Sequence, residues 1–228
     1  MDKKTRDSYA KALADYCDKN SRFDLNKPVS QAYKSLPICL IDCVYSLRSQ
    51  YNSVTVPIVK RYAQTFLNGD PFSADDTISR FLENVQKCGG VKAFGKDILK
   101  SKNKLGGKVA IPKENIVCKI AEYLKALKIE TIQDFKFFEC QELLSVVLYG
   151  VKGMNNAGVN YLFMLAGDSN RCKPDVHIHH AIKDACGQDV SDDECQELFV
   201  GAVEILKKKY PSLSVRQLDG IIWGAYRK

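Results

Sequence analysis

Apolar residues recur at intervals of three and four along most of this chain, which places them on one face of an α-helix. No stretch of convincing length alternates between apolar and polar residues, the pattern of a half-buried strand. The periodicity predicts helices at 5–18, 35–47, 54–67, 73–87, 114–128, 132–138 and 139–149, and one from residue 155 or 156 to 167. The pattern therefore predicts an all-α fold.

Polar residues at the start of a helix accept hydrogen bonds from its first N–H groups. Ser73 is the predicted N-cap of the helix that ends near Lys87, with Asp75 and Asp76 close to the positive end of its dipole. These residues predict where that helix begins.

The helical pattern stops between residues 87 and 113, where the sequence reads KCGGVKAFGKDILKSKNKLGGKVAIPK. Glycine and lysine dominate this segment, which predicts an irregular, exposed and basic connection. Two interpretations are open. The segment is either a solvated loop or a surface that faces phosphate groups.

The composition is that of an ordinary globular protein, with 228 residues, 45% apolar and 27% charged. This length suits one or two closely packed domains with a sizeable core. The net charge of +7 permits a polyanionic partner without requiring one. No apolar run approaches the roughly 20 residues of a membrane span, and the start, MDKKTRDSYA, lacks the apolar core of a signal peptide. We expect a cytoplasmic protein with no membrane partner.

Nine cysteines are present, but no two of them form a CxxC pair. Cys39 and Cys43 lie four apart in the apolar stretch ICLIDCVYSL, where buried free thiols fit better than a pair of metal ligands. An odd number of cysteines in a chain of this kind also argues against a disulfide framework.

The stretch FECQELLSVVLYGVKGMNNAGVNYLFMLAG, residues 138–167, predicts two helices joined by a tight turn. Gly150 and Gly153 are expected to supply backbone conformations that other residues resist. Asn155 or Asn156 is expected to cap the second helix.

Such a turn exposes N–H groups at a helix N-terminus, and Lys152 adds a positive charge to it. The combination is typical of an anion-binding site. The alternative is that the turn is only a packing corner between two helices, which is common in helical proteins.

All three histidines lie in KPDVHIHH, residues 173–180, two positions or more after Asp175. His177 and His180 would share a helix face, but a metal site needs a further ligand with matching geometry, and we expect no metal here. Asp175 is either a catalytic carboxylate or the N-cap of the helix that follows, and one residue can have both roles.

The order of these elements resembles the helix-hairpin-helix superfamily of DNA glycosylases, the relatives of endonuclease III. In that family a hairpin of the LPGVGRKTA type holds a DNA phosphate, and a VDTH-type segment about twenty residues later carries the catalytic aspartate. Gly153–Ala157 (GMNNA) matches the second half of the hairpin, and Asp175–His177 (DVH) matches the aspartate segment.

Two further stretches support the resemblance. Leu47–Tyr62 is similar to the helix-loop-helix that delivers the DNA-inserting side chain, and Leu218–Tyr226 is similar to a closing helix of several relatives. The resemblance implies two helical subdomains with a DNA-binding cleft between them. One spans 35–155 and ends in the hairpin, and the other comprises 1–34 and 156–228 and carries the aspartate.

The resemblance also implies roles for individual residues. Asp175 would be catalytic, since a carboxylate near C1′ stabilises the positive charge that develops on the sugar as the base leaves. Arg48 falls where relatives carry a wedge side chain; the alternative is a surface residue paired with a carboxylate. The expected DNA-binding residues are Arg48, Gln50, Tyr51, Gly150, Lys152, Gly153, Asn155, His177 and His179. The base-pocket candidates, which are alternatively core residues, are Asp42, Tyr45 and Tyr149.

The chain also departs from the family pattern. The first hairpin glycine has no clean match, so the register of residues 150–153 is open between two alignments. Asn155 occupies the position of the lysine of the bifunctional enzymes, and an amide cannot form a Schiff base. Cys172, Cys186 and Cys195 are spaced too widely for the iron–sulfur loop of some relatives. We therefore expect a monofunctional enzyme without a cofactor.

The resemblance thus implies a monofunctional DNA glycosylase that acts on double-stranded DNA with a flipped base, and we expect it to be a monomer. The base is damaged, mismatched or modified, and the role is base excision repair or defence against modified phage DNA. Two alternatives remain: a non-catalytic helix-hairpin-helix DNA-binding protein, and a metal-dependent hydrolase that uses the histidines.

Overall fold

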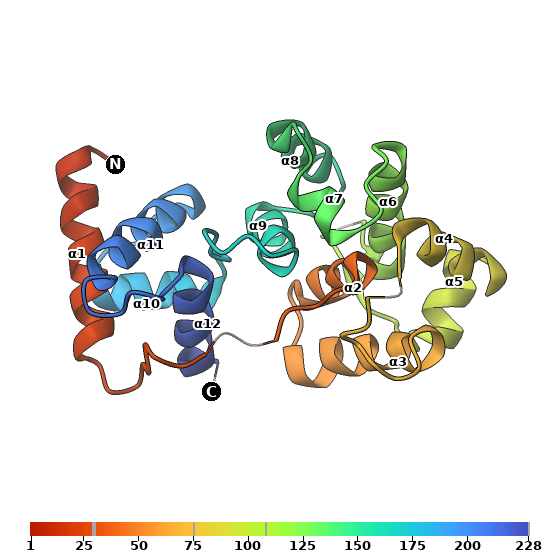
Figure 1. The fold of residues 1–228 in the computed structure, drawn as a ribbon, viewed down its shortest axis with the longest axis horizontal. Coiled ribbons are helices and arrows are strands. Elements are labelled where there is room, and N and C mark those ends of the chain that lie inside the picture. The colour runs from red at the N-terminus through yellow and green to blue at the C-terminus, as the bar shows by residue number, and fades with distance from the viewer. Residues whose placement is uncertain (29–30, 75, 108, 228) are drawn as a thin grey trace. The chain divides into compact units, whose positions relative to one another are not determined.

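The computed structural model describes residues 1–28, 31–74, 76–107 and 109–227. The described chain is predominantly helical, which confirms the all-α prediction (Figure 1). It divides into two compact units. Unit 1 comprises Met1–Gln31 and Asp168–Lys228, and unit 2 comprises Ala32–Gly167.

In its described residues, unit 2 contains eight α-helices, two short π-helices (η) and a pair of two-residue strands. In chain order these are α2 (Leu36–Ser46), η1 (Tyr51–Thr55), α3 (Val56–Phe66), α4 (Ile78–Lys87), α5 (Val91–Ala93), η2 (Phe94–Ile98), β1 (Lys104–Leu105), β2 (Ile111–Pro112), α6 (Lys113–Ala126), α7 (Ile132–Lys136), α8 (Gln141–Tyr149) and α9 (Asn156–Leu165). The strands pair antiparallel, with Lys104 opposite Pro112.

Unit 1 is built from helices at the two ends of the chain. They are α1 (Lys3–Lys19), α10 (Val176–Cys186), α11 (Asp192–Leu206) and α12 (Val215–Tyr226). Helix α1 packs along α11 and α10, so the N-terminal helix completes the core of the C-terminal segment.

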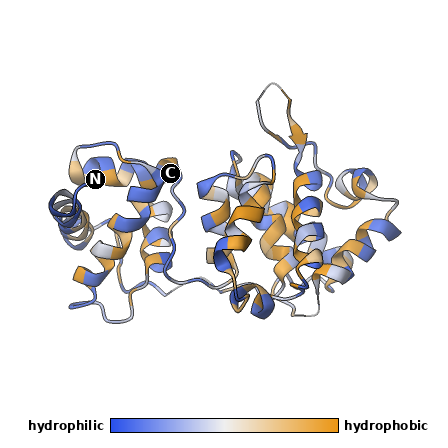
Figure 2. Cartoon of the chain, turned by 90° about the horizontal axis from the view of Figure 1, so that it is seen from above, coloured by the Kyte–Doolittle hydropathy of each residue, from blue (hydrophilic) through white to orange (hydrophobic). Residues whose placement is uncertain are grey.

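Helix α2 is the centre of unit 2, as its apolar sequence predicts. All eleven of its residues are buried, and it packs against α3, α6 and α9 (Figure 1). Ser35 caps its N-terminus by accepting a hydrogen bond from the N–H of Ile38. A helix that is apolar on every side is stable only when other elements surround it. In Figure 2 the apolar residues of unit 2 accordingly gather on the inward faces of its helices.

The boundary between the units differs from the one expected after residue 155. Helix α9 belongs to unit 2, because its apolar residues pack into the core around α2. The thiol of Cys43 approaches the carbonyl oxygen of Gly158 at 3.1 Å, and the rings of Phe135 and Phe163 lie 5.0 Å apart. Unit 1 therefore resumes at Asp168.

The predicted cap of α4 is wrong. Thr77, not Ser73, accepts a hydrogen bond from the first turn, and the helix begins at Ile78. Asp76 points inward instead of lying beside the helix dipole: it is 3% exposed and accepts a 2.6 Å hydrogen bond from the hydroxyl of Tyr62. Asp75 lies outside the described residues.

The lysine-rich segment 87–113 is more regular than its composition predicts. It contains α5, η2 and both strands, because three of its apolar side chains are buried in unit 2. These are Phe94, Leu99 and Leu105.

Six of the nine cysteines are buried, among them Cys39 and Cys43, as the sequence predicts for those two. No helix in the described ranges is both long and apolar enough to cross a lipid bilayer.

Candidate functional site

The glycine turn, defined as residues 150–155 between α8 and α9, has its own packing. The N–H of Val151 donates to the carbonyl of Leu148 at 3.1 Å, and the N–H of Met154 donates to Val151 at 3.0 Å. Val151 and Met154 are both buried in the core of unit 2. The turn is therefore held in one conformation by contacts within unit 2.

Only one of the two glycines in this turn needs to be glycine. Gly153 has a φ of 106°, and a Cβ there would lie 2.9 Å from the Cδ1 of Ile116 and 3.2 Å from the Cδ2 of Leu105. Gly150 has a φ of −66° and a ψ of −15°, which any residue adopts. The expectation that Gly150 supplies a special conformation is wrong, because α8 continues into it as an ordinary helical residue.

The turn presents donors that could meet an anion. Lys152 is exposed, and the N–H groups of Lys152 and Gly153 donate no hydrogen bond to any residue that the structure describes. Asn155 caps α9, with its Oδ1 accepting from the N–H of Gly158 at 3.0 Å. Free N–H groups in a turn that leads into a helix, together with an ammonium group, form an electropositive site.

The wedge loop, defined as residues 47–50, follows α2. Arg48 is exposed and has a φ of 51°, a left-handed conformation uncommon for a residue with a Cβ. The loop lies beside the start of α9, because a Cβ on Gly158 would be 3.2 Å from the Cδ1 of Leu47. Gln50 is exposed and accepts a 3.1 Å hydrogen bond from Ser53. The structure therefore brings the wedge loop and the glycine turn together in unit 2.

A buried lysine holds this loop, and the sequence pattern gives no sign of it. Lys113 is 1% exposed, and its Nζ donates to the carbonyls of Tyr45 and Leu47 at 3.0 and 2.6 Å and to the Ser49 hydroxyl at 2.8 Å. Burying an ammonium group is costly unless it is fully hydrogen-bonded, and the end of α2 supplies carbonyls for that purpose. Lys113 thereby fixes the backbone from which Arg48 projects.

Asp42 is completely buried and is surrounded by three tyrosines. Its Oδ2 accepts hydrogen bonds from the hydroxyls of Tyr33 and Tyr51 at 2.8 and 2.7 Å, and its Oδ1 accepts one from Tyr161 at 2.9 Å. Burial and the charge of Asp42 raise the pKa of each tyrosine well above its usual range, so all three remain donors. Sequence reasoning named Asp42 and Tyr51 but missed Tyr33 and Tyr161, which no local pattern connects to Asp42.

The other two base-pocket candidates have different surroundings. Tyr45 has no exposed surface, and its hydroxyl donates to Glu114 at 3.3 Å, so it lies in the core and not on a pocket wall. Tyr149 is the last residue of α8 and is 44% exposed.

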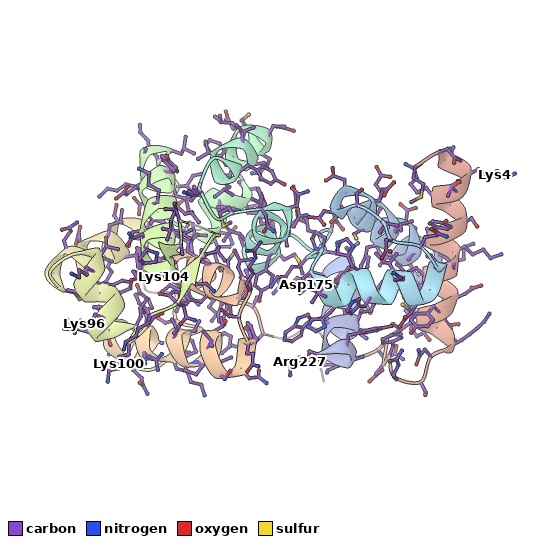
Figure 3. The ribbon with its side chains drawn as sticks, turned by 180° about the vertical axis from the view of Figure 1, so that it is seen from behind. Lys4, Lys96, Lys100, Lys104, Asp175 and Arg227 are labelled. Carbon is purple, nitrogen blue, oxygen red and sulfur yellow. The ribbon has the colours of Figure 1, made fainter. Side chains whose placement is uncertain are left out.

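In unit 1, Asp175 is the N-cap of α10 (Figure 3). Its Oδ1 accepts hydrogen bonds from the N–H groups of His177 and Ile178 at 2.9 and 3.3 Å. Its Oδ2 has no hydrogen-bond partner within the described ranges, and the residue is half-buried. One carboxylate oxygen is thus fixed by the helix, while the other is available.

A second carboxyl group, which the sequence analysis did not single out, lies behind this turn. Asp219 of α12 is 6% exposed, and its Oδ2 accepts a 2.8 Å hydrogen bond from the N–H of Lys173. The carbonyl of Lys173 in turn accepts from the N–H of Asp175 at 2.7 Å. Burial, and to a smaller extent the charge of Asp175, raise the pKa of Asp219 to about 7.

The aromatic face next to Asp175 comes from α10 and α12. The rings of His177 and Trp223 meet edge to face at 6.4 Å, and the guanidinium of Arg227 lies 4.4 Å from the centroid of Trp223. His177 therefore packs on α12 near the candidate carboxylate.

The ring of His179 is paired within unit 1. Its Nε2 lies 2.9 Å from the Oδ1 of Asp192, and its ring contacts the thiol of Cys195 at 3.6 Å. Burial raises the pKa of Cys195 to about 12, so the thiol stays protonated and this trio is no nucleophilic triad. The expectation that His179 contacts DNA is not supported by this geometry, because its polar edge is already paired within unit 1.

No three potential ligands among His, Cys, Asp and Glu gather closely enough in the described ranges to hold a metal ion.

One family model, described as a domain of unknown function (DUF8548), matches residues 11–227. No curated protein and no solved structure matches the chain. The match extends over most of both units, and the description of the family names no activity.

Proposed function

We propose that this chain, which belongs to the DUF8548 domain family, is a monofunctional DNA glycosylase. It hydrolyses the N-glycosidic bond of a damaged, mismatched or modified base that has been flipped out of duplex DNA. The observation that carries the proposal is the carboxylate of Asp175, which is held by the first turn of α10 through one oxygen only.

The chemistry requires one well-placed carboxylate. As the bond between C1′ and the base nitrogen breaks, the base takes the bonding electrons and the sugar becomes positively charged. The Oδ2 of Asp175 stabilises that charge and orients a water molecule, whose oxygen bonds to C1′. The water supplies one proton in net terms to the departing base, which leaves an abasic sugar.

DNA binding is assigned to unit 2. In this proposal the glycine turn receives a backbone phosphate at the N–H groups of Lys152 and Gly153, and the Lys152 ammonium adds its charge. Arg48, on the loop held by Lys113, enters the space that the flipped base leaves. The contact between Leu47 and the start of α9 keeps these two elements in register.

Asn155 supports the monofunctional assignment. Its side chain caps α9 and carries an amide instead of an amine, so this position offers no nucleophile for a Schiff base.

The decisive experiment is a base-release screen on duplexes that contain damaged, mismatched and phage-type modified bases, followed by hot alkali to reveal abasic sites. Asp175→Asn should abolish release while DNA affinity changes less than about threefold, because asparagine caps a helix as well as aspartate does. Asp2→Asn, which changes the N-cap of α1 in the same unit, is the matched control and should retain full activity. Equal turnover in Asp175→Asn and the native chain would rule out the assignment.

One observation favours a second candidate function, a DNA-binding protein without catalysis. Asp175 has a complete structural role as the cap of α10, and that role alone accounts for its position. Under this alternative the native chain binds duplex DNA tightly but releases no base from any duplex in the screen.

A further inference from the structure

Six lysines lie in the short segment 87–104 of unit 2, with Asp97 as its one acidic residue. All six side chains are exposed. We call them the lysine surface; they are Lys87, Lys92, Lys96, Lys100, Lys102 and Lys104. Figure 3 shows Lys96 and Lys100 at one end of unit 2 and Lys104 nearer its middle.

The lysine surface is not neutralised by the protein. None of its six ammonium groups pairs with a carboxylate in the described part of the chain, where the lysine ion pairs involve Lys19, Lys119, Lys183 and Lys209 instead. Clustered like charges repel one another and cost stability unless a partner of opposite charge offsets them. The cluster therefore favours a polyanionic partner.

The backbone beneath these lysines is fixed. Phe94 and Leu99 are fully buried, and the Nε of Arg61 on α3 donates to the carbonyl of Leu99 at 2.8 Å. Gly95 lies so close to α6 that a Cβ would be 2.6 Å from the side chain of Glu114. A charged surface on a fixed backbone loses less conformational entropy on binding than a loose loop does.

The lysine surface is continuous with the glycine turn. On β1, Leu105 faces inward and packs against Gly153, while its neighbour Lys104 faces solvent. The exposed Lys152 lies in the same turn. Positive charge thus extends from the candidate phosphate site across β1 to η2.

The chemistry of the surface favours duplex backbone over unpaired bases. Phe94 is the one aromatic residue of the segment 87–104 and is fully buried, so the segment itself offers no ring on which a single-stranded base could stack. Lysine acts as a point charge that meets phosphates without reading base edges.

We propose that the lysine surface binds the phosphate backbone of duplex DNA next to the glycine turn and extends the footprint of the protein beyond the target base. This inference deepens the proposed function and rests on its DNA-binding part only. The surface contributes affinity for any duplex sequence and takes no part in bond cleavage.

The test compares two triple variants of the full chain that lose the same charge. Lys96→Gln, Lys100→Gln and Lys104→Gln together remove half of the lysine surface. Lys3→Gln, Lys4→Gln and Lys11→Gln remove three exposed lysines of α1 and serve as the control. The affinity of each protein for an undamaged duplex is measured across a series of salt concentrations.

The first triple variant should bind about tenfold or more weakly at near-physiological salt, and its salt slope should fall by roughly 2–3, since each lost phosphate contact removes about 0.9. The control should keep the slope of the native chain. Equal losses in the two triples would show a net-charge effect only and would overturn the proposal. A preference for single-stranded RNA over duplex DNA of the same length would overturn it as well.

The measurements distinguish a wrong proposal for the lysine surface from a wrong assignment of the catalytic residue. The first triple variant should need more enzyme to reach the same base release, in proportion to its weaker binding, whereas Asp175→Asn should lose release at every enzyme concentration and keep the native salt slope. If no duplex yields an abasic site but the two triple variants still differ in salt slope, the glycosylase assignment is wrong while the proposal that the lysine surface binds duplex DNA is supported.

Discussion

At the residue scale, two buried aspartates have environments that their sequence neighbours do not reveal. Burial raises the pKa of Asp76 to about 6 and that of Asp219 to about 7. Desolvation is the larger cause in each, since a carboxylate loses hydration when it leaves water. Ionisation of either carboxyl group therefore lowers the stability of the fold as the pH rises, whereas a carboxyl group in an exposed ion pair adds stability as it ionises.

Asp219 should make the protein less stable as the pH rises. Its folded pKa lies above its unfolded value of 3.8, so its stabilising contribution is complete below about pH 4 and is lost as the pH rises through about 7. Asp219→Asn should remove this loss and raise the free energy of unfolding at pH 8, relative to the native chain, by on the order of a few kcal/mol.

Urea unfolding at pH 5 and pH 8 measures this difference, with Asp7→Asn on the exposed face of α1 as control. The charged groups around Asp219 are Lys173, Asp175 and Arg216, and they are unchanged in both variants. A pH dependence that Asp219→Asn leaves as steep as in the native chain would contradict the assignment.

At the scale of single elements, the glycine turn shows how one residue position sets a local geometry. Gly153 combines a left-handed backbone with close contacts to Ile116 and Leu105, whereas Gly150 has neither feature to the same degree. The turn is thus anchored to α6 and β1 through Gly153. This anchoring also determines which N–H groups face solvent.

Gly153→Ala should therefore destabilise the protein by about 1–3 kcal/mol and weaken duplex binding, because the strained turn moves its N–H groups. Gly150→Ala is the matched control and should change both quantities much less, since its φ suits alanine. Chemical denaturation and duplex affinity, measured on the same preparations, provide the two readouts. Equal effects of the two substitutions would show that the positive φ of Gly153 has no special role.

At the scale of the whole molecule, the chain builds two hydrophobic cores, one for each unit. Unit 1 joins the first helix to the last three, and unit 2 is a continuous segment. The proposed catalytic carboxylate and the proposed phosphate contacts therefore belong to separately packed parts of the chain.

The whole chain contains many lysines, any of which could in principle act as an amine nucleophile. We expect that none does, because under the proposed function Asn155 occupies the position of the lysine that reacts in the bifunctional glycosylases. Borohydride added during turnover should therefore trap no covalent adduct between the protein and DNA. Efficient trapping would contradict the monofunctional assignment and would identify the lysine that reacts.

Local sequence was sufficient for most of the secondary structure. The spacing of apolar residues predicted α1 to α4 and α6 to α9, because helix formation depends on neighbours three and four positions away, but it predicted neither α5 nor α11. Short polar residues before apolar runs gave Asn155 or Asn156 as the cap of α9 and capping as one of two roles for Asp175, and the structure shows Asn155 and Asp175 as caps. The prediction of Ser73 as a cap was wrong because a contact between distant residues overrides the local pattern. Tyr62 bonds to Asp76 in the interior, and the helix starts later, at Ile78.

The sequence by itself determined the helical class, the free cysteines and the position of Asp175 before a helix. Only the tertiary structure decided which side chains meet across long separations. It gathered Tyr33, Tyr51 and Tyr161 around Asp42, buried Lys113 beneath the wedge loop and placed Asp219 behind Asp175. The physical reason is that a buried charge is stable only with specific partners, and those partners come from other elements, where no sequence periodicity connects them.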